Sequence, residues 1–221
     1  MINILGEIPH EVILSCSGGV DSMAVLDFLI QGGRSVTVLN FNHGTDYGRT
    51  TSHKLQTYCE SKNINFMLID ISSEYEYDSK ISKEANWHNK RYQHFTALSK
   101  DTNIPIITCH HLDDQVENWI MTSLVGDPFL IQYRNSKAGV IRPFLLTRKS
   151  DFYSWCNRKD IPYWEDPSNA DTRYRRNLVR KEVLPAALRV NPGIHKTIAK
   201  KIQQEYNEKV TKVIRDCSST G

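Results

Sequence analysis

The sequence has few cysteines and no long hydrophobic run. Its five cysteines are dispersed, odd in number and never spaced as CxxC. This argues against a disulfide framework, a zinc ribbon and a dithiol redox site. No apolar run approaches the roughly 20 residues that span a bilayer, so we expect no membrane partner. The N-terminal MINILGEIPHE has no basic stretch before an apolar core, so we expect no signal peptide and a cytoplasmic protein.

The net charge is also small. A net charge of +3 does not by itself indicate a nucleic-acid partner. Its distribution is more informative, because an arginine-rich stretch lies in the second half of the chain. The composition, 39% hydrophobic and 24% charged over 221 residues, is that of an ordinary globular protein with one substantial domain and a small appendage.

Short β-branched apolar runs alternate with longer periodic runs, a pattern that predicts buried strands and helices. Strands are expected over residues 12–16, 36–41, 66–71, 105–109 and 139–145, and helices over residues 21–30, 49–62, 83–100, 113–124, 149–159 and 178–190. The alternation predicts an α/β, Rossmann-like fold with a parallel sheet of about five strands and helices on both faces. We expect a main domain over residues 1–188 and a helical extension over 189–221.

Three polar clusters follow predicted strands directly. They are SGGVDS after the first strand, NHG after the second and HHLDD after the fourth. In a parallel sheet the ligand crevice lies beyond the carboxyl ends of the strands. Because all three polar clusters are expected at the same edge of the sheet, they favour a ligand site there more strongly than any single motif does.

The SGGVDS turn, Ser17–Ser22, is built to approach an anion. Glycines let the backbone come close to a ligand, and the N–H groups of the turn and of the following helix form an anion cradle. Asp21 would repel a phosphate unless Mg²⁺ lay between them. The alternative is a simple capping turn in which Asp21 caps the helix. The turn has no lysine and no GxxxxGK[ST] pattern, so it is not a Walker motif.

Two further stretches carry unusual groups. The CHHLDDQVEN segment has two interpretations. Its histidines and aspartates either cap a helix and interact favourably with the helix dipole, or they bind a metal. In DTRYRRNLVR four arginines surround Tyr174. They are either a solvated basic helix start or contacts for RNA phosphates and unstacked bases.

At this point the chain resembles a known family. SGGVDS after a first strand is similar to the PP-loop of the ATP pyrophosphatase superfamily, whose fold is adenine nucleotide alpha hydrolase-like. The segments NHG, EANWHNKRY, HHLDDQVE, IRPFL and DPSNADTRYRRNLVR resemble those of one branch, the tRNA(Ile)-lysidine synthetases. The tRNA thiolases need paired cysteines and the GMP and asparagine synthetases need a glutaminase domain, and neither is present here.

The resemblance implies a ligase that forms a C–N bond. The wobble cytidine of the CAU anticodon of tRNA(Ile) is adenylated at C2 by ATP with Mg²⁺, and lysine then displaces AMP to give lysidine. Residues 1–188 would be the PP-loop catalytic domain. The resemblance leaves the oligomeric state of the protein open, with a homodimer as one alternative.

The resemblance also assigns residues. The implied catalytic residues are Asp21, Glu84, Arg91, His111, Asp113, Asp114 and Glu117. The implied ATP-binding residues are Ser17, Gly18, Gly19, Val20, Asp21, Ser22, Asn42 and His43, with Asp21 and Asp114 as the Mg²⁺ ligands. The implied tRNA-binding residues are Arg142, Arg148, Tyr174, Arg176, Asn177 and Arg180.

The sequence departs from the family pattern in two places. The stretch LVGDPFLIQYRN replaces a glycine-rich basic segment, and we expect a short form without the further C-terminal domains usual in bacterial members. Both departures bear on how tRNA(Ile) is told from the methionine tRNA with the same anticodon. Two alternatives remain: an AMP-transferase with another acceptor or amine, and a nucleotide- or tRNA-binding protein that has lost catalysis.

Overall fold

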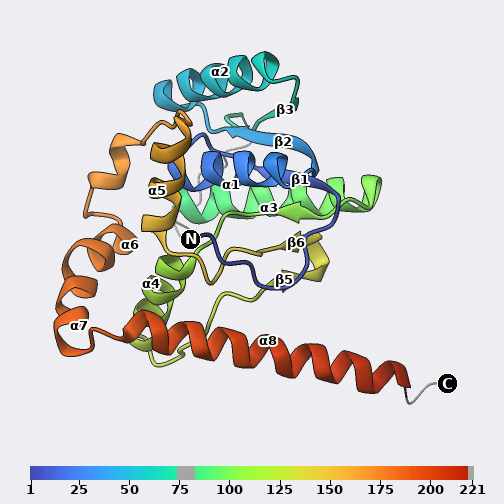
Figure 1. Cartoon of the computed structure of the whole chain (residues 1–221). Helices are drawn as coiled ribbons and strands as arrows, with labels where there is room; N and C mark the ends of the chain where they lie inside the picture. Colours follow the sequence, from blue (N-terminus) through green and yellow to red (C-terminus); the bar gives the residue numbers. More distant parts are fainter. Residues whose placement is uncertain (74–82, 219–221) are drawn as a thin grey trace.

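The computed structural model describes residues 1–73 and 83–218, with side chains for residues 1–73 and 85–212. A six-stranded sheet with the order β3-β2-β1-β4-β6-β5 runs through its middle (Figure 1). The strands are β1 (Glu11–Ser15), β2 (Ser35–Asn42), β3 (Asn65–Asp70), β4 (Ile106–Ile107), β5 (Arg134–Asn135) and β6 (Val140–Ile141). Every pairing is parallel except that of β5 with β6.

Helices follow the strands in the order that crossover connections require. They are α1 (Val20–Gln31), α2 (Asp46–Ser61), α3 (Lys83–Thr102), α4 (Leu112–Ser123), α5 (Lys149–Lys159), α6 (Arg175–Leu178), α7 (Leu184–Val190) and α8 (Ile194–Ser218). Short 3-10 helices lie at Ser136–Ala138 and Pro167–Ala170, and a π-helical turn lies at Val179–Val183. None of the helices in the described part of the chain is long and apolar enough to cross a membrane.

The strand β1 shows how the sequence builds two layers of core. Its side chains alternate between the two faces of the sheet. Val12 and Leu14 pack with α1, α2 and α5, whereas Ile13 packs with Phe95 of α3 on the opposite face. Both faces are therefore buried, which is why this segment is an unbroken apolar run. The predicted α/β fold with helices on both faces is confirmed.

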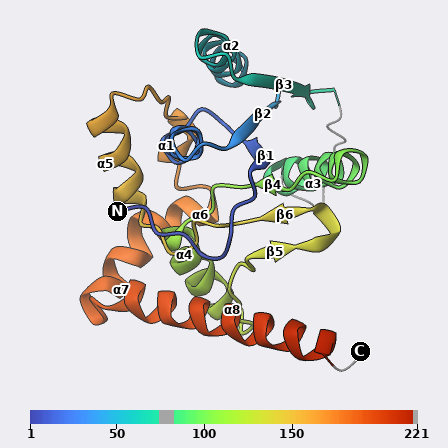
Figure 2. The same ribbon diagram turned by 45° about the vertical axis from the view of Figure 1, so that its right-hand side comes forward.

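A third cluster joins the C-terminal helix to the rest. Leu112 and Val116 of α4 and Leu184 of α7 pack with Ile198 and Ile202 of α8. Both views place α8 along one end of the molecule, beside α4 (Figure 2).

Several boundaries differ from the sequence prediction. The expected strand 139–145 is only β6, because Pro143 has no N–H to continue a ladder. The expected strand 105–109 is only β4, and β5 is an additional antiparallel edge. The predicted helix 178–190 starts earlier and is interrupted by the π-helical turn. Pro185 explains the interruption, since its ring would clash with the carbonyl of Lys181 in a regular α-helix.

We predict that Phe152→Ala, at a side chain with no exposed area that packs edge-on against Phe144, lowers the free energy of unfolding by about 3–5 kcal/mol. Urea denaturation measures the change. The control is Val190→Ala, at a residue 88% exposed, which should cost no more than about 0.5 kcal/mol. Equal costs would contradict the assignment of Phe152 to the core.

Candidate active site

The N-terminal ends of α1, α4 and α5 meet beyond the carboxyl ends of β1, β4 and β6. Asp21 of α1 lies 3.6 Å from His111 at the start of α4, and Lys149 of α5 lies 3.8 Å from the same Asp21 carboxylate. The PP-loop turn and the HHLDD segment, 90 residues apart in the sequence, thus form one cluster of charged side chains.

The turn that precedes α1 requires glycine at Gly18. Its φ is +82°, and a Cβ there would lie 2.7 Å from Thr51 Cγ2 and 3.1 Å from the Trp164 ring. The backbone N–H of Trp164 donates to the Gly18 carbonyl at 2.9 Å. This hydrogen bond fixes the loop after α5 against the turn. Gly19, not Asp21, is the N-cap of α1, and none of the described side chains caps the helix. The capping interpretation of Asp21 is therefore wrong, and the N–H groups of the first turn have no side-chain acceptor in the part of the chain that the structure describes.

His111 both caps α4 and bridges two carboxylates. Its Nδ1 accepts from the Asp114 N–H at 3.3 Å, and Asp114 Oδ2 accepts from the His111 N–H at 3.0 Å. Its Nε2 lies 3.6 Å from both Asp21 Oδ2 and Asp114 Oδ2. Burial acts to lower the pKa of His111, but the charges of Asp114, Asp21 and Asp113 outweigh it and raise that pKa.

One carboxylate oxygen in this cluster is left over. Asp21 Oδ1 is buried and has no hydrogen-bond partner among the described residues, while His111 and Lys149 both face Oδ2. Such an oxygen fits a hard cation, and Mg²⁺ is usually held by one or two carboxylates together with substrate phosphates. Asp114 fits less well, because its oxygens already face the His111 N–H and Arg176.

Asp113 joins three helices. It accepts from the Lys149 N–H at 2.7 Å, and Nε2 of His195 lies 3.2 Å from its other oxygen. Nε of Arg148 lies 3.4 Å away. Burial acts to raise the pKa of Asp113, but these donors, led by His195, hold it well below its ordinary value.

Arg176 and Arg180 pair with acids of α4. Arg180 Nε donates to Glu117 Oε1 at 2.6 Å, and Arg176 Nε donates to Glu117 Oε2 at 3.1 Å. Glu117 is nearly fully buried. The hydrogen bonds that Arg180 donates to Glu117 raise the pKa of Arg180. Burial acts to raise the pKa of Asp114, but His111 and Arg176 hold it well below its ordinary value.

The residues after β2 form a second group. The Asn42 side chain donates to Asp70 and accepts from the Gly44 N–H, so it shapes the NHG turn. The His43 ring lies 4.6 Å from the Trp87 ring. Burial, with a contribution from the charge of Arg91, lowers the pKa of His43 to about 4, so its ring is neutral at pH 7. Glu84 lies in the first turn of α3, and its side chain is outside the described residues.

The remaining residues predicted to bind tRNA have different surroundings. Arg142 is buried and donates to the Gln132 carbonyl and the Tyr92 hydroxyl. Asn177 is buried and donates to carbonyls of the 168–171 loop. Tyr174 is 45% exposed. Arg142 and Asn177 therefore support the fold around the site, whereas Tyr174 can contact a ligand.

Sequence reasoning missed three residues here: Lys149, Trp164 and His195. Trp164 stands at the start of the WEDPSNADTRYRRN stretch but matches none of its motif positions, and His195 enters the site only because α8 packs against α4. The position of Lys149 next to Arg148 at a predicted helix start was the one available signal.

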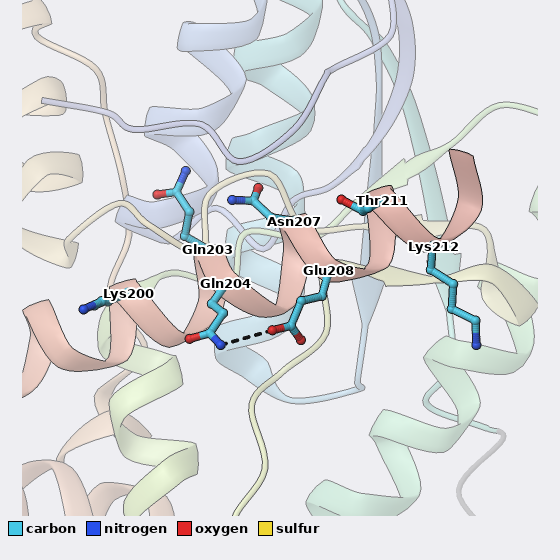
Figure 3. Close-up of a pocket in the computed structure, with 7 residues that line it drawn as sticks. All are labelled: Lys200, Gln203, Gln204, Asn207, Glu208, Thr211 and Lys212. Atoms are coloured by element: carbon cyan, nitrogen blue, oxygen red, sulfur yellow. Dashed lines mark hydrogen bonds between the residues drawn. The ribbon is translucent and has the colours of Figure 1, made fainter. Parts of the chain in front are cut away.

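A shallow surface depression lies elsewhere. Figure 3 shows the seven side chains that line it, all on α8, with Gln204 donating to Glu208. None of the seven belongs to the charged cluster described above.

Comparisons with known proteins agree with this geometry. A family model described as PP-loop domain matches residues 3–187. The chain is 29% identical to a tRNA(Ile)-lysidine synthase of Francisella philomiragia, covering 97% of this chain and 58% of that protein. It is 30% identical to one of Bacillus subtilis, covering 95% and 49%. The chain thus spans about half of the length of these curated relatives.

A solved structure supports the fold alone. The U34-tRNA thiolase NcsA from Methanococcus maripaludis, with its [4Fe-4S] cluster, superposes with a TM-score of 0.70 at 13% identity. The match covers 91% of this chain and 74% of that one.

The lowered pKa of Asp113 predicts a loss of stability in acid. The folded chain holds this carboxylate ionised, so its contribution is present above the unfolded pKa of about 3.9 and is lost as the pH falls below it. Asp113→Asn should lower the free energy of unfolding at pH 7 by on the order of 2 kcal/mol and flatten its decline in acid. Denaturation between pH 2 and pH 7 tests this, with the exposed Asp127→Asn as control. An unchanged acid slope in Asp113→Asn would contradict the assignment.

The surroundings of Gly18 predict that Gly18→Ala disrupts the turn. Gly33 is the matched control, because its φ is +71° but no atom of the described residues lies within 4 Å of the Cβ position there. Gly33→Ala should cost about 1–2 kcal/mol of backbone strain, and Gly18→Ala a further 1–3 kcal/mol from overpacking. Thermal unfolding measures both costs, and a fluorescent ATP analogue should lose binding only in Gly18→Ala. Equal behaviour of the two variants would argue against the tight turn.

Proposed function

The chain belongs to the PP-loop family, and we propose that it is an ATP-dependent ligase that joins lysine to the wobble cytidine of a CAU-anticodon tRNA(Ile). The observation that carries the ATP part is the uncapped glycine turn of α1 with the buried, unpartnered Oδ1 of Asp21 beside it. The tRNA and lysine parts are supported by the relatives named tRNA(Ile)-lysidine synthase, which match nearly the whole chain.

The first step places ATP with its phosphates on the turn Ser17–Ser22. The C2 oxygen of the cytidine attacks the α-phosphate, and pyrophosphate departs. The free N–H groups of the α1 first turn stabilise the charge on the leaving group, as oriented donors do in other enzymes. Mg²⁺, held by Asp21, would neutralise part of this charge when bound.

The second step brings the lysine amine to the activated C2, and AMP departs. Asp113 and Asp114 have pKa values held well below the ordinary range, so they stay ionised and are weak proton acceptors. Their role in this step is therefore to hold His111 and α5 in place, while the amine of lysine attacks in its neutral form after losing its proton to solvent. Glu117, locked by Arg176 and Arg180, contributes by holding these arginines near the site.

The exposed Tyr174 is the residue we assign to RNA. The wobble base must leave its stack to reach the site, and an aromatic ring can stack on a displaced base. Arg148, with 43% of its side chain exposed, adds a positive charge beside the cluster for the RNA backbone. Arg176 and Arg180 are one-third exposed or less while paired with acids, so they contribute charge more than direct phosphate contacts.

The test is incubation of the full chain with ATP, Mg²⁺, radiolabelled lysine and a CAU isoleucine tRNA transcript. We predict lysine incorporation at the wobble cytidine. Asp21→Asn should retain the fold, since no described donor bonds Oδ1 and the contacts of Oδ2 at 3.6 and 3.8 Å are longer than hydrogen bonds, but it should lower kcat by about 100-fold or more.

Three outcomes separate the alternatives. Pyrophosphate release that needs tRNA but incorporates no lysine would indicate another amine or acceptor. Nucleotide binding with neither signal would indicate a binding protein. Equal labelling of the methionine tRNA with the same anticodon would show that the chain does not discriminate between them.

A further inference from the structure

Lys149 stands at the start of α5 and has no role in the assignments above. Its Nζ lies 3.8 Å from Asp21 Oδ2, next to the glycine turn. The turn itself contains no lysine, unlike a Walker motif. A cation therefore reaches the anion cradle from a helix 128 residues further along the chain.

The backbone of Lys149 is firmly held. Its N–H donates to Asp113 Oδ2 at 2.7 Å, and Asp113 is held in turn by His195 of α8. Further along α5, Phe152 is fully buried, and the Cys156 thiol faces the Val20 carbonyl in the first turn of α1 at 3.8 Å. The start of α5 is thus fixed relative to the turn.

The ammonium group, in contrast, is weakly engaged. The distance of 3.8 Å to Asp21 is longer than a hydrogen bond, and no closer partner of Nζ lies among the described residues. The side chain is 29% exposed, so a pair with Asp21 alone would contribute little to stability. The three N–H donors of Lys149, on a side chain whose backbone is held in place, are available for an incoming anion.

We propose that Lys149 is a further catalytic residue, whose ammonium group binds the pyrophosphate portion of ATP on the Ser17–Ser22 turn. As the bond between the α-phosphorus and the bridging oxygen breaks, the electron pair moves to that oxygen on the β-phosphate. The Lys149 ammonium stabilises this charge without transferring a proton. This role rests on the proposed use of ATP.

The simpler alternative is that Lys149 only orients Asp21. In that case its loss would leave the affinity for metal-free pyrophosphate unchanged. Direct contact predicts instead that the affinity for pyrophosphate falls and the affinity for adenosine does not.

The experiment measures the Kd of inorganic pyrophosphate, ATP and adenosine by titration calorimetry on the full chain without added metal. Lys149→Met should raise the Kd of pyrophosphate and of ATP by about 10- to 100-fold, as expected for the loss of a charge-assisted hydrogen bond. The Kd of adenosine should stay unchanged. Lys149→Arg should restore most of the loss. The control, Lys159→Met, removes the same charge from the exposed last residue of α5 and should bind as wild type. Lys149→Gln gives the same comparison if methionine disturbs the fold.

Wild-type affinity for pyrophosphate in both neutral variants would overturn the role of Lys149, even if the wild type incorporates lysine into tRNA. The reverse pattern is also distinguishable. Pyrophosphate binding that depends on Lys149, in a chain that incorporates no lysine, would support Lys149 and refute the proposed ligase.

Discussion

The site depends on the contacts that the buried His111 ring makes. Through Nδ1 it caps α4, and through Nε2 it faces Asp21 and Asp114 at once. The two carboxylates repel each other, and the His111 ring, with Nε2 3.6 Å from each of them, relieves that repulsion. His111 and Lys149 both face Oδ2 of Asp21, and the buried Oδ1 has no hydrogen-bond partner among the described residues. One side chain thus joins helix capping, charge balance and the orientation of the residue that we expect to hold Mg²⁺.

Asp113 extends the same cluster to the end of the chain. It joins the start of α5 to α8 through the Lys149 N–H and His195. The C-terminal helix is therefore part of the support of the site. It is tied both by this contact and by the apolar cluster of Ile198 and Ile202 with α4. A change in the packing of α8 would reach Lys149 through Asp113 without touching the glycine turn.

Much of this arrangement could be predicted from the sequence, because its signals are local. The SGGVDS turn depends on glycine backbone freedom, and the placement of the polar clusters depends on the common edge of a parallel sheet. The pairing of Arg176 and Arg180 with Glu117 was not predictable, since the partners are about 60 residues apart and a basic run looks the same whether it is solvated or paired. His195 was missed for the same reason: its partner is 82 residues away. The π-helical turn is caused by Pro185. The spacing of apolar residues, which predicted the helix, carries no information about this effect of proline.

The central claim is that His111, by facing Oδ2 of Asp21, leaves Oδ1 without a protein partner, so that Oδ1 can bind a metal ion beside the phosphates. His111→Asn tests it most directly, because asparagine is also a good helix N-cap but cannot reach both carboxylates. The measurement is the Kd of ATP with and without Mg²⁺ in wild type and in this variant. The account predicts that Mg²⁺ tightens ATP binding in the wild type, and that this tightening falls by about tenfold or more in a folded His111→Asn variant. An equal Mg²⁺ effect in both proteins would contradict it.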